Sequence, residues 1–245
     1  MATNHTQSGG DTLATDVNSG GALAAIERNL ADGSYRVGEW QRWLAAIEQD
    51  PTFNLSASAE QVDRVSNQLH RRNGFREFSF DTVWCGQWLL AIAGLTVMVT
   101  GSVTGVVIGT GLLALAAQPL IKSSVGLLLG VRYAYAYLWY VEPRFKMRYS
   151  TYLGLSSNAR IGLHLAGSLG TPAALLAGCL CADSAESTLW TVVIGLAFAG
   201  ATALQVGAFV AESLDVRHVA GFRLANLTSP ATAARELRKA RQTSR

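Results

Sequence analysis

Charged residues are scarce in this sequence, and the shortage is concentrated in two long stretches. Only 15% of the 245 residues are Asp, Glu, Lys or Arg, whereas soluble domains average about a quarter. Residues 83–121 contain no charge, and residues 161–211 contain only Asp183 and Glu186. A bilayer core is crossed by about 20 apolar residues of helix. These runs therefore exclude an ordinary soluble globular protein and predict an integral membrane protein.

Other absences narrow the class of protein further. The segment 1–20 has neither a basic nor an apolar run, so we expect a disordered tail and no secretory signal. The three cysteines are too few for a disulfide framework and are predicted to be packing residues. Phosphate loops, nucleophile elbows and zinc-protease motifs are missing. The sequence therefore predicts no catalytic residue, metal site or cofactor, and a net charge of +3 gives no reason to expect nucleic acid as a partner.

The segment 21–79 has the pattern of a small soluble helical region. Leu23 and Ile26 stand at helical spacing, and a second apolar stripe surrounds Trp40. A capping-box pattern that begins at Ser58 predicts the start of a third helix. We therefore expect three short amphipathic helices before the apolar region.

The apolar region is long enough for four spanning helices arranged as two hairpins. We expect these helices at about 82–100, 103–121, 160–182 and 188–211, with the first turn at Thr100–Ser102. The fold class is thus all-α, a polytopic helical membrane protein with a soluble N-terminal helical region. The predicted segments are the disordered tail (1–20), the soluble helices (21–79), hairpin one (80–122), an aromatic and basic helix and loop (123–156), hairpin two (157–212) and a basic tail (213–245).

An alternative places the first turn near Gln118–Ser123. It gives long helices over 84–117 and 124–141, also four spans in total, but it puts Lys122 on the outer side. We favour the turn at Thr100–Ser102 because both turns then lack cations.

The distribution of Lys and Arg predicts the orientation. The cations cluster before the first span, between the second and third, and after the fourth, while the two turns carry none. Positively charged loops remain on the cytoplasmic side. Both termini are therefore expected in the cytoplasm, which in a bacterium corresponds to the inner membrane.

An aromatic run followed by cations, VRYAYAYLWYVEPRFKMRY over 131–149, separates the two hairpins. A fifth span here would carry Arg144 and its neighbours across the membrane, and strand edges would be unsatisfied in lipid. We therefore predict that the second helix continues over 123–150, either at the membrane surface or projecting into the cytoplasm, with Tyr133, Tyr137 and Tyr140 on one face. The cations of the segment Arg144–Arg148 would then bind anionic lipid headgroups.

Several residues are candidates for packing or for polar sites. Gly101, Gly105 and Gly109 recur every four residues, which favours close helix packing within the hairpin or, alternatively, a homo-oligomer. Polar candidates within the spans share one helical face. They are Arg160, His164 and Ser168. Candidates at the cytoplasmic face, where a solvated Asp215–His218 pair is expected, are Tyr133, Tyr137, Glu142, Arg144, Glu212, Asp215 and His218.

Three functions are compatible with these features. The first is a non-enzymatic accessory or assembly subunit of a membrane complex, with the bilayer and other membrane proteins as partners. The second is a small oligomeric transporter or channel that uses Arg160 and His164. The third is a membrane enzyme acting on lipid at its cytoplasmic face. We expect the first, because no catalytic motif accompanies the spans.

Overall fold

The computed structural model describes residues 19–50, 52–139, 142–216, 218–219, 222–223 and 228–243, with backbone alone for 218–219 and 222–223. The chain divides into two compact units, Met1–Arg72 and Asn73–Arg245. Residues 1–18 of the predicted tail lie outside the described residues, and so does Tyr140.

The first unit is built from three short helices. They are α1 (Ser19–Ala31), α2 (Glu39–Ile47) and α3 (Leu55–Arg71). Leu23 is fully buried, and the indole rings of Trp40 and Trp43 stack with centroids 4.8 Å apart. Glu27 of α1 accepts hydrogen bonds from Gln61 (2.8 Å) and Arg64 (2.9 Å) of α3. The amphipathic stripes expected here thus form one small apolar core.

Helix α3 begins three residues earlier than the capping-box pattern predicts. Asn54 is the N-cap, and its side-chain oxygen accepts a hydrogen bond from the Ala57 amide at 3.0 Å. Ser58 lies inside the helix, so the predicted start is wrong. An asparagine oxygen satisfies a free amide of the first turn as well as a serine does, and the sequence pattern did not separate the two.

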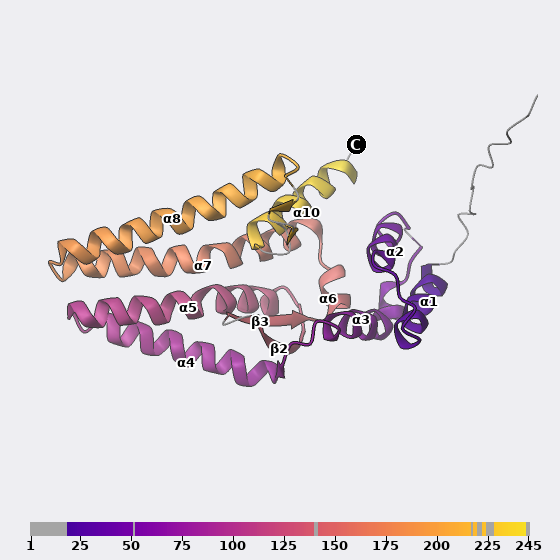
Figure 1. The fold of residues 1–245 in the computed structure, drawn as a ribbon, viewed down its shortest axis with the longest axis horizontal. Coiled ribbons are helices and arrows are strands. Elements are labelled where there is room, and N and C mark those ends of the chain that lie inside the picture. Colours follow the sequence, from indigo (N-terminus) through magenta and orange to yellow (C-terminus); the bar gives the residue numbers. More distant parts are fainter. Residues whose placement is uncertain are drawn as a thin grey trace, which may run out of the picture. The chain divides into compact units, whose positions relative to one another are not determined.

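The second unit contains four helices that are long and apolar enough to cross a membrane, which confirms the predicted helical class. They are α4 (Phe80–Met98), α5 (Val103–Leu128), α7 (Ser157–Ser184) and α8 (Thr188–Ser213). They form two antiparallel hairpins, with α5 and α7 side by side and α4 and α8 outside them (Figure 1). Both connecting turns lie at one end of the bundle, which we call the tip end.

The first turn is a short connection between Met98 and Val103. Gly101 has a φ of 75°, a left-handed conformation that glycine adopts without strain. Ser102 caps α5 by accepting a hydrogen bond from the Gly105 amide at 3.0 Å. Helix α5 continues through Gln118–Ser123, so the alternative turn there is wrong.

Close contact between α5 and α7 joins the two hairpins. A Cβ added to Gly170 would lie 2.5 Å from the Cα of Gln118, and one added to Gly178 would overlap the Thr110 side chain. Small residues at such positions allow two helix backbones to approach closely. The same principle operates within hairpin one, where a Cβ on Gly109 would lie 2.5 Å from the Gly94 carbonyl oxygen.

Residues 133–139 and 142–147 form two strands, so the predicted helix is wrong beyond Leu128. Strands β2 (Tyr133–Trp139) and β3 (Glu142–Met147) pair antiparallel, and β1 (Glu77–Phe78) adds to the other edge of β2. Unpaired backbone groups at a strand edge are strongly unfavourable only in the hydrocarbon core of a membrane, where no water can bind them. This sheet lies at the end of the bundle away from the tips, alongside the last turns of α5 (Figure 1).

Two features of the sequence explain the strand. Gly130 has a φ of 86°, and the Val131 amide returns to the Gly126 carbonyl at 2.8 Å, which ends α5 in a glycine-capped turn. Aromatic residues then alternate with alanine or leucine, a period-two pattern suited to a strand. The Tyr133 ring stacks on Phe80 with centroids 4.8 Å apart, which fixes the sheet to the start of α4.

The predicted basic tail contains a docked helix, α10 (Ser229–Thr243), which packs against α7 and α8. Ala231, Ala233 and Ala234 are buried in this contact. Short side chains let a strongly charged helix lie close to its neighbours. Together with the short helix α6 (Tyr149–Leu153) and the strands β1, β2 and β3, α10 forms what we call the cap, at the end of the bundle opposite the tips.

The α5–α7 contact predicts how two glycine substitutions differ. We expect Gly170→Ala to destabilise the protein by about 1–3 kcal/mol, because its methyl group meets the backbone of α5. Gly200→Ala in α8 is the matched control, since nothing lies within 4 Å of its added Cβ. Thermal unfolding in mild detergent measures both. Equal midpoints would show that the hairpins do not meet at Gly170.

Candidate functional site

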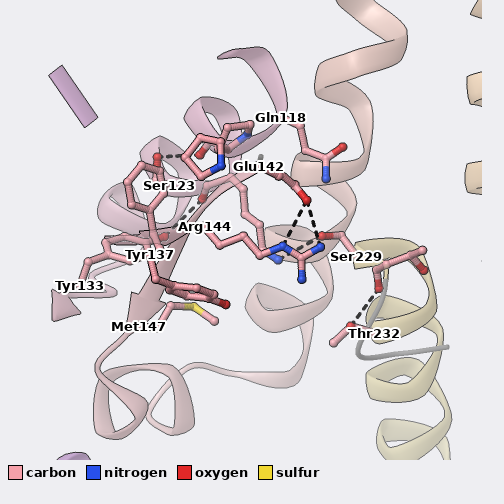
Figure 2. A pocket seen from close by; sticks show the side chains of 14 residues that line it. Gln118, Ser123, Tyr133, Tyr137, Glu142, Arg144, Met147, Ser229 and Thr232 are labelled. Atoms are coloured by element: carbon pink, nitrogen blue, oxygen red, sulfur yellow. Dashed lines mark hydrogen bonds and ion pairs between the residues drawn. The ribbon is translucent and has the colours of Figure 1, made fainter. Parts of the chain in front are cut away.

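A cavity of about 210 Å³ opens in the cap between the end of α5, the β2–β3 hairpin and the start of α10. Hydroxyl, amide and charged side chains surround it (Figure 2). The polar lining residues include Gln118, Lys122, Ser123, Glu142, Arg144 and Ser229. This is where three chain segments that are distant in sequence meet.

Lys122 stands in the second-last turn of α5 and reaches the cavity from there. Its ammonium donates a hydrogen bond to the Ser229 hydroxyl at 3.0 Å. Its aliphatic stem lies over Gly167 of α7, where an added Cβ would come within 3.0 Å of the stem. The glycine therefore leaves the space that the lysine occupies.

Arg144 and Glu142 lie on β3 and form an ion pair within the lining. The Glu142 carboxylate accepts hydrogen bonds from Nε (3.2 Å) and Nη2 (3.0 Å) of Arg144. The guanidinium also lies over the Trp139 ring, 3.8 Å from its centroid. These contacts hold Arg144 beside the cavity, and its charge is largely balanced by the carboxylate.

Two tyrosines from β2 complete this wall. Burial raises the pKa of the Tyr133 and Tyr137 hydroxyls above their usual value. Both phenols therefore stay protonated and neutral at physiological pH. Tyr133 donates a 3.4 Å hydrogen bond to the Lys122 carbonyl. The tyrosines thus add neutral hydroxyls to the lining and no negative charge.

The first turn of α10 faces the cavity with its positive end. Thr228, Ser229 and Thr232 all belong to the lining. The Thr228 hydroxyl accepts a 3.4 Å hydrogen bond from the Ala231 amide and caps the helix. A helix N-terminus carries a partial positive charge and free amides, so α10 contributes to the field in the cavity.

A second polar cluster is built from side chains of α6, α7 and α10. The Tyr152 hydroxyl and His164 Nε2 are 3.0 Å apart, and His164 is only 4% exposed. Burial raises the pKa of Tyr152, so its protonated hydroxyl can donate to the ring nitrogen. Arg160 pairs with the buried Glu236 of α10 at 3.4 Å. The two contacts tie α7 to α6 and to α10.

Arg238 forms a further clamp between α10 and the end of α8. It binds the carboxylates of Glu212 and Asp215 simultaneously. The Glu212 side chain is 4% exposed and that of Asp215 is 57% exposed. Asp215 therefore pairs with Arg238. The sequence suggested His218 as its partner, but the His218 side chain lies outside the described residues.

The predicted site residues thus separate into distinct groups. Tyr133, Tyr137, Glu142 and Arg144 line the cavity, whereas Glu212 and Asp215 belong to the clamp of α10. The predicted face of α7 is also divided. Arg160 and His164 pair with the cap, and Ser168 donates to the carbonyls of its own helix at 3.1 and 2.7 Å.

The glycines predicted for packing also take different places. Gly101 lies in the turn of hairpin one, whereas Gly105 and Gly109 lie against the end of α4.

Sequence reasoning missed the residues that complete these sites. Lys122 was counted only as a loop charge, and Tyr152 and Glu236 were not singled out. A lysine that directly follows a long uncharged run was the available signal for Lys122. A hydroxyl residue followed by proline is typical of a helix start. The sequence Thr228-Ser229-Pro230 was therefore the available signal for α10. Their convergence depends on tertiary contacts that no local pattern shows.

No protein-family model matches the chain, and searches of characterised proteins and of solved structures found no significant match.

The clamp predicts an asymmetry between two substitutions. We expect Arg238→Met to cost about 3–5 kcal/mol of docking free energy, because it leaves the buried Glu212 carboxylate unpaired. Asp215→Asn is the matched control and should cost at most about 1 kcal/mol, since Asp215 is exposed. Hydrogen exchange of the α10 amides measures both effects. Unchanged exchange in Arg238→Met would contradict the clamp.

Proposed function

We propose that the protein is a non-enzymatic component of a membrane assembly, with four spanning helices and its cap on the cytoplasmic side. The observation that carries the proposal is the pairing of charges within the cap and between the cap and the ends of α7 and α8. Three carboxylates, Glu142, Glu212 and Glu236, each accept an arginine. Such contacts hold elements in place, and they leave these carboxylates poorly suited to act as a general base.

The charge distribution along the bundle supports the cytoplasmic orientation of the cap. Among the residues described for the second unit, Lys and Arg belong to the cap, the cap end of the long helices and the segments beside them. The turn between α7 and α8 carries the acidic residues Asp183 and Glu186. Cations remain on the cytoplasmic side of membrane proteins, so the tips would face the opposite compartment.

The outer helices offer a surface suited to lipid. Leu89 on α4 is 68% exposed, and Leu196 and Leu204 on α8 are 69% and 77% exposed. Large apolar side chains exposed along whole helices are unfavourable in water. In a bilayer or against another apolar helix they are well accommodated.

The two other functions have less support in this geometry. A transporter or channel needs polar groups along its path, but the central parts of the four helices contain no Asp, Glu, Lys or Arg. The polar candidates Arg160 and His164 contact the cap. A lipid-acting enzyme would combine Glu142 with Glu212, and these residues belong to separate clusters, the cavity and the clamp.

Reporter fusions test the orientation directly. We expect a reporter inserted at Ser184 to face the outer compartment and one attached after residue 245 to face the cytoplasm. Paired alkaline phosphatase and fluorescent fusions, active on opposite sides of a bacterial inner membrane, measure this. Both reporters in one compartment would contradict the two-hairpin topology.

Native purification tests the role in an assembly. We expect the tagged protein in mild detergent to elute with a partner or as a homo-oligomer, because its outer helices present wide apolar faces. Size-exclusion chromatography with light scattering gives the mass, and an unrelated four-span protein purified in parallel is the control. A monodisperse monomer that carries no other protein would contradict the proposal.

A further inference from the structure

We propose that the cavity in the cap binds a phosphate group, held by Lys122, Arg144 and the first turn of α10. The proposal goes beyond the role in an assembly and does not depend on it. It begins with the charges of the lining. Among the described residues, three charged side chains line the cavity. They are the cations Lys122 and Arg144 and the carboxylate Glu142. Since Glu142 pairs with Arg144, one positive charge remains in excess.

That excess charge resides on Lys122. Its ammonium has three donors, and the contact at its tip is a neutral hydroxyl, that of Ser229. An ammonium held among protein atoms beside a second cation is unfavourable without a counter-charge. A bound anion would supply the missing charge and accept the remaining hydrogens.

The other groups favour an anion with several oxygens. Glu142 occupies Nε and Nη2 of Arg144, while guanidinium groups have five donors in all. The hydroxyls of Tyr137 and Thr232 add neutral polar groups to the lining, and the first turn of α10 borders the same space. Helix N-termini combined with Lys and Arg are a common phosphate environment. Donors come from three elements, which suits a tetrahedral group.

Size and position agree with this ligand. The 210 Å³ of the cavity far exceeds the ~10–15 Å³ that one water requires. Lys122 lies six residues before the last residue of α5, which is about 9 Å along the helix axis. In the proposed orientation this depth corresponds to the cytoplasmic headgroup layer. The phosphate can therefore come from a phospholipid headgroup or from a soluble phosphate compound.

Native mass spectrometry of the full chain in mild detergent tests the proposal. The probes are phosphatidic acid, diacylglycerol with the same acyl chains, and inorganic phosphate as a competitor. We expect phosphatidic acid to bind and diacylglycerol, which lacks only the phosphate, to bind much more weakly. Displacement by inorganic phosphate indicates a soluble source, and its failure to displace indicates a lipid source. Equal binding of the two lipids, or binding of neither lipid nor phosphate, overturns the proposal.

Two variants distinguish phosphate binding in this cavity from non-specific attraction of phosphate to the basic surface. Lys122→Met keeps the stem over Gly167 and removes the charge, so we expect about 10- to 100-fold weaker phosphate binding. Lys146→Met removes one charge from the same strand as Arg144, outside the lining, and should retain binding. Equal loss in both variants, or no loss in Lys122→Met, contradicts the site.

A second variant covers the possibility that Lys122→Met does not fold. The double variant Glu142→Gln with Arg144→Gln removes the ion pair without changing the net charge. We expect it to weaken phosphate binding about 10-fold. Unchanged binding in this variant counts equally against the cavity.

Discussion

The contact between α5 and α7 is the constraint on which the rest of the second unit depends. Each hairpin could form alone, since its two helices are joined by a short turn. Gly167, Gly170 and Gly178 of α7 allow α5 to approach closely, and Gly167 leaves room for the Lys122 stem. The same approach that joins the hairpins therefore places a lysine inside the cap. Packing and the electrostatics of the cavity are two consequences of one contact.

Burial explains why the cap is rich in paired charges. Glu212 of α8 and Glu236 of α10 are both buried, and each needs a cation because an unpaired buried carboxylate is costly. Arg238 and Arg160 provide these cations from opposite directions, one on α10 and one on α7. The partners of each pair lie on different elements, so each pair also fixes the position of a helix. Lys122 differs from these arginines, because its ammonium faces a hydroxyl.

Sequence periodicity predicted the parts of the fold that local chemistry determines. Long uncharged runs mark the four helices, and Gly101 marks the first turn. The prediction of a helix in the aromatic run was wrong because it assumed unsatisfied strand edges, whereas these strands pair with each other and with β1. The alternation of Tyr and Ala and the left-handed Gly130 are the local features that favour a strand here. Four of the fourteen lining residues of the cavity were among the predicted candidates, namely Tyr133, Tyr137, Glu142 and Arg144.

Helix α10 could not be placed from its sequence because its contact surface is made of alanines, which carry no strong apolar signal. That surface gives α10 two roles at once. It supplies Ser229 and its positive end to the cavity, and it is held by Arg238 at the clamp. A group that binds the cavity through contacts with α10 also stabilises the docked position of this helix. Docking of α10 strengthens binding of the group by the same free energy, because coupling is reciprocal. The clamp and the cavity are thereby coupled through one rigid helix, although their charged residues do not touch.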